Sequence, residues 1–224
     1  MDYSPIWISL KTTLCSTVIT FLLGILAAWL VVRMQNKRVK VLADGLLTVP
    51  LVLPPTTAGF FLLYLFGVNR PIGAFVLDVF GYKIAFSWLA TVISAVVVSF
   101  PLMYRSARSG FESVEQNMVD EAKMLGLGKF AILYRILVPC AWPSILSGLI
   151  LSMTRGMGEY GATAMLAGNI AGKTRTLPLA VYSEVAAGHM DRAWVYVSVI
   201  LVVALWAVCL LNVFTEHEER RIKL

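Results

Sequence analysis

The chain has 224 residues, of which 58% are hydrophobic and 14% are charged. Soluble proteins contain about 45–50% apolar and about 25% charged residues, so a water-soluble core of this size could not hide so much apolar surface. The mean hydropathy of +0.78 also excludes a disordered chain. The composition therefore indicates a protein that uses lipid as the solvent for part of its surface.

A formal net charge of +6 could indicate binding to nucleic acid. In a membrane protein, however, an excess of basic residues more often marks the segments on the cytoplasmic side, and we favour this interpretation. The cysteines are odd in number and lie in or beside apolar stretches, which implies no disulfide framework. They are Cys15, Cys140 and Cys209.

Five apolar stretches reach the roughly 20 residues that a helix needs to cross a bilayer. They predict spanning helices over residues 7–32, 46–66, 84–104, 142–166 and 193–214. No basic region precedes the first stretch and no small-residue cleavage site follows it, so it indicates a retained helix rather than a signal peptide. The sequence therefore predicts an all-helical membrane protein with a single transmembrane domain over residues 1–224.

The distribution of lysine and arginine predicts the orientation of these helices. The segments after the first helix, between the third and fourth, and after the fifth hold 12 basic residues, against 6 on the opposite side. Because cytoplasmic segments carry the excess of basic residues, we expect the N-terminus outside and the C-terminus in the cytoplasm. Two sizeable segments then lie on the outer side of the membrane, residues 67–83 and residues 167–192. Residues 176–187 predict a short helix that is either interfacial or re-entrant.

The predicted cytoplasmic loop over residues 105–139 is too substantial to be a simple connection. Ser113 and Gln116 have the spacing of a capping box, which predicts the start of a helix over 114–125. Gly126 suits the left-handed position that ends a helix. A second helix over 129–138 is predicted to stop at Pro139.

The same loop contains Glu-Ala-Lys at 121–123, then Gly126, then Ile-Leu-Val-Pro at 136–139. These residues and their spacings resemble the EAA loop of ABC importer permeases. Lys123 and Val138 depart from that pattern without removing the glycine turn or the proline. The resemblance implies that a coupling helix docks in a cleft of an ATP-binding subunit, with Glu121, Ala122, Gly126 and Pro139 as the coupling residues.

Three further motifs are Pro-Leu-Val-Leu-Pro-Pro at 50–55, Gly-Glu-Tyr-Gly-Ala-Thr at 158–163 and Thr-Arg-Thr-Leu-Pro at 174–178. They are similar to motifs of the molybdate-type permease subunit, and tungstate and sulfate permeases share parts of them. The similarity implies a type I ABC importer permease architecture. It also implies two permeases, two ATPases and an external oxyanion-binding protein. ATP and Mg²⁺ would then bind the partner ATPase, with no cofactor in this chain.

Arg155 and Glu159 lie four residues apart inside the fourth predicted span, so they share one helix face. Ionisable groups within a membrane usually pair or line a cavity. The pair therefore predicts either mutual neutralisation with dimer packing or an anion-favouring field along the pathway. A permanent strong oxyanion site is not expected, because conduction requires release.

Pro50, Pro54 and Pro55 interrupt the second predicted span, since each removes a backbone donor and disturbs the preceding turn. Two readings remain open. One is a fixed kink, and the other is a pore gate formed by Pro54 and Pro55 with Thr56 and Thr57.

Two glycine patterns resemble nucleotide-binding motifs, but neither stands where such a motif would work. The GxGxxG pattern at 156–161 follows an apolar span rather than a strand. The P-loop-like pattern at 168–174 has three residues between its glycines instead of four, and it falls on the predicted outer side of the membrane. No metal-ligand spacing and no catalytic constellation is present. Together with the resemblance, which implies a permease of this kind, these absences lead us to expect a homodimeric permease subunit, not an enzyme, that carries molybdate or a similar tetrahedral oxyanion such as tungstate or sulfate into the cytoplasm. The alternatives are a stand-alone secondary anion transporter and a membrane-embedded enzyme.

Overall fold

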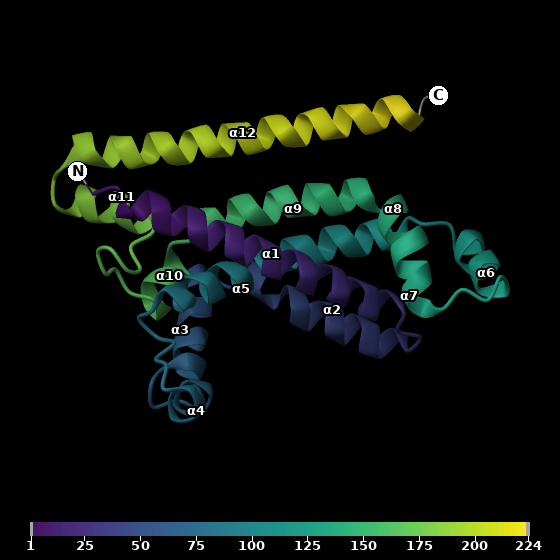
Figure 1. Cartoon of the computed structure of the whole chain (residues 1–224), viewed down its shortest axis with the longest axis horizontal. Helices are drawn as coiled ribbons and strands as arrows, with labels where there is room; N and C mark the ends of the chain where they lie inside the picture. The colour runs from purple at the N-terminus through teal and green to yellow at the C-terminus, as the bar shows by residue number, and fades with distance from the viewer. Residues whose placement is uncertain (1, 223–224) are drawn as a thin grey trace.

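The computed structural model describes residues 2–222, with side chains over residues 2–213. Every regular element in this part of the chain is helical, which confirms the predicted fold class. The molecule is elongated, and α1, α5, α9 and α12 run along its long axis (Figure 1). The elements are α1 (Ser4–Val32), α2 (Lys37–Val52), α3 (Pro55–Phe66), α4 (Pro71–Phe80), α5 (Trp88–Glu112), α6 (Gln116–Met124), α7 (Lys129–Ile132), the π-helical η1 (Leu133–Leu137), α8 (Val138–Cys140), α9 (Trp142–Met157), α10 (Gly161–Leu166), α11 (Leu177–Ala186) and α12 (Met190–Ile222).

Three helices are long and apolar enough to cross a bilayer alone: α1, α5 and the Met190–Val213 part of α12. Two helix pairs qualify as bent spans. The bend is 111° between α2 and α3, and 77° between Lys129–Cys140 and α9. By length and composition, the described residues therefore hold between three and five candidate spans.

Small and hydroxyl-bearing side chains line the contact between α1 and α5 at the centre of the molecule. The hydroxyls of Thr12 and Thr91 lie 2.8 Å apart, and a second hydrogen bond joins the next pair along the seam, Thr20 and Ser99. At Gly24, an added Cβ would come within 2.6 Å of the Met103 side chain. In lipid, small residues let helix backbones approach closely and buried hydroxyls bond across the contact. The seam therefore holds the two helices together.

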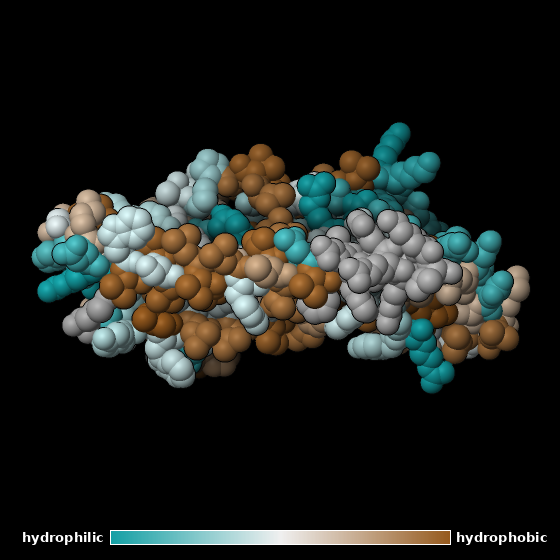
Figure 2. All heavy atoms as spheres, turned by 90° about the horizontal axis from the view of Figure 1, so that it is seen from above, coloured by the Kyte–Doolittle hydropathy of each residue, from teal (hydrophilic) through white to brown (hydrophobic). Residues whose placement is uncertain are grey.

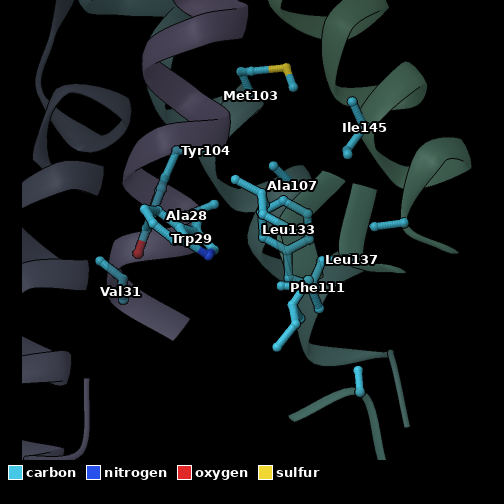
Figure 3. Packing of buried hydrophobic residues seen from close by; sticks show 13 residues of the cluster. Ala28, Trp29, Val31, Met103, Tyr104, Ala107, Phe111, Leu133, Leu137 and Ile145 are labelled. Carbon is cyan, nitrogen blue, oxygen red and sulfur yellow. The ribbon is translucent and has the colours of Figure 1, made fainter. Parts of the chain in front are cut away.

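A hydrophobic cluster joins the helical bundle to the loop between α5 and α9 (Figure 3). It contains buried side chains from α1, α5, η1 and α9, among them Trp29, Phe111, Leu137 and Ile145. Ala122 of α6 belongs to the same cluster. Since burying apolar area stabilises a contact by about 25 cal/mol per Å², this loop is anchored to the bundle and does not hang free.

The span predicted over 46–66 is broken, as its prolines led us to expect, whereas the prediction of a single helix over 142–166 is wrong. The first breaks between α2 and α3, where Pro54 and Pro55 disfavour a helical conformation in the residues before them. The axes of α2 and α3 meet there at an angle of 111°. The second breaks at 158–160, because Gly158 ends α9 and α10 starts only at Gly161.

Two short helices lie in the half of the molecule that also carries the N-terminus, α11 beside that terminus and α4 beyond the end of α3 (Figure 1). α4 occupies the predicted turn-rich segment and ends at Gly81, whose φ of 65° is left-handed. α11 confirms the short helix expected near 176–187, and its first residue is fixed to α1 by the Leu177 N–H, which donates to Ser9 Oγ at 2.7 Å.

The exposed surface of the spans is largely apolar. Figure 2 shows hydrophobic side chains gathered along the middle of the long axis, with hydrophilic ones at the ends. On α12, large side chains such as Trp194, Val202 and Leu205 are at least 60% exposed. Lipid or a partner helix must cover a surface of this kind.

Candidate functional site

The loop between α5 and α9 presents α6 at the end of the molecule farthest from α11 (Figure 1). On this helix Glu121 is exposed, whereas Ala122 is 3% exposed and packs into the hydrophobic cluster. One face of α6 is therefore held by the bundle and the other faces away from it.

A glycine turn ends α6. The Leu127 N–H donates to the Ala122 carbonyl at 3.0 Å, and the Gly126 N–H donates to the Lys123 carbonyl at 2.9 Å. This is the Schellman pattern, in which the residue after the cap adopts left-handed φ. Gly126 has φ of 78°, which confirms the predicted conformation. The turn sets the direction in which the chain enters α7.

The predicted capping box at Ser113 and Gln116 is wrong. α5 runs on to Glu112, so Ser113 is used to close that helix and its hydroxyl donates to the Gly110 carbonyl at 2.8 Å. α6 begins at Gln116 without a side-chain cap. The side chain of Gln116 donates instead to Asp120.

The prediction that Pro139 ends the second helix of the loop is also wrong. The helical segment runs from Lys129 to Cys140 and includes the π-helical turn η1. Pro139 lies inside this segment, in α8 directly after η1. The wider π turn before it gives the ring room.

Arg155 and Glu159 form an ion pair with 2.8 Å between Arg155 Nη1 and Glu159 Oε2. The Glu159 side chain is 1% exposed and that of Arg155 is 33% exposed. The other carboxylate oxygen of Glu159 accepts the Ala162 N–H at 2.8 Å. Glu159 therefore does two things: it neutralises Arg155 and it holds the start of α10.

The proline bend and the break after α9 meet in space. At Gly161 an added Cβ would lie 2.9 Å from Pro55 Cβ and 3.0 Å from the Thr56 nitrogen. At Gly59 it would lie 2.7 Å from Ala162 Cα. Thus α3 and α10 touch through backbone, and the structure brings together two sets of candidate residues that the sequence placed about 100 positions apart. Pro54, Pro55 and Thr56 are exposed and Thr57 is half-buried.

An ion-pair network that the sequence interpretation missed ties α2 to α5. Arg108 binds both Asp44 and Glu112, Lys40 reaches Glu112 at 2.8 Å, and Tyr104 donates to Asp44 at 2.9 Å. The signal in the sequence was a lone acidic residue, Asp44, in an otherwise basic and apolar stretch. No group of three or more His, Cys, Asp or Glu residues suited to a metal ion occurs in the described part of the chain.

The tip of the loop carries two exposed apolar side chains that were also missed. Met124 is 88% exposed and Leu125 is 83% exposed, directly before the Gly126 turn. Large apolar side chains this exposed at the end of a polar helix are typical of a contact surface. Two apolar residues ahead of the glycine were the signal that could have revealed them.

The helical bundle with its anchored loop at one end matches the fold of solved ABC importer permeases. The chain is similar to a solved structure of the MetNI methionine ABC transporter in an inward-facing conformation. The TM-score is 0.66, with 14% identity and 94% of both chains covered. At this identity the likeness defines the fold class alone.

The chain belongs to the family of binding-protein-dependent transport system inner membrane components, which matches residues 20–224. It is 39% identical to the molybdenum transport system permease protein ModB of Haemophilus influenzae, covering 82% of this chain and 80% of that one. It is 38% identical to ModB of Escherichia coli K12, covering 81% and 79%. The chain is therefore a multi-pass inner membrane component of a transport system and not an enzyme, and the resemblance seen in the loop motif is confirmed.

Proposed function

We propose that this chain is the permease subunit of an ABC importer that carries molybdate into the cytoplasm. The observation that carries the proposal is the identity of 38–39%, over about four fifths of the chain, to molybdenum transport permeases. An anchored coupling loop with its Gly126 turn supports the same role.

The working unit in this proposal is two copies of this chain with two ATPase subunits and an extracytoplasmic oxyanion-binding protein. ATP and Mg²⁺ bind the ATPases. The C-terminus and the loop over 105–139 face the cytoplasm, and the N-terminus, α4 and α11 face outward. The binding protein then docks on the outer segments 67–83 and 167–192.

The coupling step follows from how α6 is held. Glu121, Met124 and Leu125 point away from the bundle and are free to enter a cleft on the ATPase. Ala122 and Leu127 pack against the bundle, so a push on α6 is passed to α1 and α5 as a rigid-body movement. Closure of the ATPases on ATP would thereby open the pore outward, and hydrolysis would reset it.

The gate in this proposal is the contact between the proline bend and the break after α9. Pro54, Pro55, Thr56 and Thr57 begin α3, which packs on α10 without intervening side chains at Gly161. Arg155, one third exposed, supplies a positive field close to this contact, and its partner Glu159 weakens that field. A weakened field suits passage of an anion better than retention of it.

Reconstituted proteoliposomes test the proposal. With the cognate ATPase and binding protein, we expect ATP-dependent uptake of molybdate that excess tungstate inhibits and chloride does not. Vesicles with this chain but without the ATPase should take up none. Uptake without the ATPase would favour a secondary transporter, and uptake of sulfate in preference to molybdate would reassign the anion.

A further inference from the structure

A cavity of about 580 Å³ lies between the end of α1, the end of α5 and the loop helices α6 and α7. Its volume falls within the range of about 300–1,000 Å³ that small-molecule sites occupy. Apolar side chains make up most of the lining, and they include Trp29, Val32, Phe111, Val119 and Leu137. Such a lining suits an apolar body rather than a free inorganic anion.

The polar lining of the cavity carries cations without carboxylates. Arg33, Lys123 and Lys129 line it together with Gln35 and Gln116. Lys123 is paired with Asp120 at 2.7 Å, and this hydrogen bond holds the pKa of Asp120 below its usual value. Arg33 and Lys129 form no ion pair among residues 2–213, and the Arg33 guanidinium lies 4.7 Å from the centre of the Trp29 ring. Two uncompensated cations therefore remain at an apolar cavity.

The cavity lies at the C-terminal end of the first candidate span. Trp29 and Val32 belong to the last turn of α1, the first candidate span. The segment Lys129–Cys140 is bent by 77° from α9. It carries the exposed aromatic residues Phe130, 66% exposed, and Tyr134, 70% exposed, and Trp142 at the start of α9 is 47% exposed. Exposed aromatic residues of this kind gather at the membrane–water interface.

We propose that this cavity binds an anionic phospholipid of the cytoplasmic leaflet, with an acyl chain among the apolar side chains and the phosphate beside Arg33 and Lys129. Basic pockets on the cytoplasmic side of membrane proteins bind anionic lipid headgroups, because their cations attract the headgroup phosphate. Because the cavity lies beside the contact that α7 makes with the end of α1, a bound lipid would support the position of the coupling loop. The proposal does not depend on which anion is transported.

Fluorescence quenching by brominated lipid tests this site directly. The full-length permease is placed in phosphatidylcholine nanodiscs that contain a small fraction of phosphatidylglycerol with brominated chains, or brominated phosphatidylcholine as the comparison. Trp29→Phe removes the fluorescence of Trp29, so the difference in quenching between the native chain and this variant reports the quenching of Trp29 alone. We expect phosphatidylglycerol to quench Trp29 at several-fold lower mole fraction than phosphatidylcholine.

Variants then distinguish a specific lipid site from a general attraction of anionic lipid to the basic surface. Arg33→Gln and Lys129→Gln should each weaken the preference for phosphatidylglycerol by about fivefold. Lys37→Gln with Arg38→Gln removes two exposed cations from the start of α2 that do not line the cavity, and it should leave the preference unchanged. Equal quenching by both lipids, or an equal loss in this control, would overturn the proposal.

Native mass spectrometry of the purified full chain gives a readout that does not depend on Trp29. We expect phosphatidylglycerol to remain bound to the native chain and to be lost from the Arg33→Gln, Lys129→Gln double variant. Retention by the double variant, or a peptide in place of lipid, would contradict the proposal.

Discussion

Gly126 is the residue on which the direction of the coupling loop depends. Its φ of 78° is costly for residues with a Cβ, by about 1 kcal/mol or more, and no atom lies within 4 Å of an added Cβ. The effect of a substitution is therefore conformational and not steric. We predict that Gly126→Val raises the ATP hydrolysed per molybdate transported several-fold at equal membrane abundance. Gly126→Asn, which tolerates left-handed φ, should stay close to the native ratio. Equal coupling in both variants would show that the turn does not transmit movement.

The Arg155–Glu159 pair is asymmetric, and this predicts unequal mutant effects. Arg155→Met leaves a carboxylate that is 1% exposed without its cation, whereas Glu159→Gln leaves an arginine that is one third exposed. We predict that Arg155→Met lowers the free energy of unfolding by about 1–3 kcal/mol and Glu159→Gln by less. The double variant should recover part of the loss caused by Arg155→Met. Thermal unfolding in detergent measures all three, and a double variant no better than Arg155→Met would disprove the coupling.

At the scale of elements, the contact between α3 and α10 depends on glycine. A Cβ at Gly161 would force α10 away from Pro55 and the backbone of Thr56. We predict that Gly161→Ala lowers the free energy of unfolding by about 1–3 kcal/mol and impairs transport, because overpacking displaces helices. Gly45→Ala within α2 meets nothing within 4 Å, so it should be neutral or stabilise by about 0.5–1 kcal/mol. Unfolding midpoints of the two variants in one detergent give the comparison.

At the scale of the whole molecule, the excess of basic residues predicts which end lies in the cytoplasm. A variant with Cys15, Cys140 and Cys209 replaced by serine provides the background. In intact cells, an impermeant maleimide should label Asn69→Cys, between α3 and α4. It should label Asn117→Cys of α6 only after the membrane is opened. The reverse pattern would invert the topology and place the coupling loop away from any ATPase.

From sequence alone it followed that this is an all-helical membrane protein, because hydropathy depends on the residues of each helix and on helix length, and not on tertiary contacts. The left-handed turn at Gly126 and the bend at Pro54 and Pro55 followed too, since each depends on the backbone chemistry of the residue itself. The capping box at Ser113 failed because α5 continues to Glu112, and the length of a helix is decided by what it packs against. The pairing of Asp44 with Arg108, and the meeting of Gly161 with Pro55, were decided only by the tertiary structure. Residues about 60 to 110 positions apart become neighbours through the packing of whole helices, and no local pattern encodes that packing.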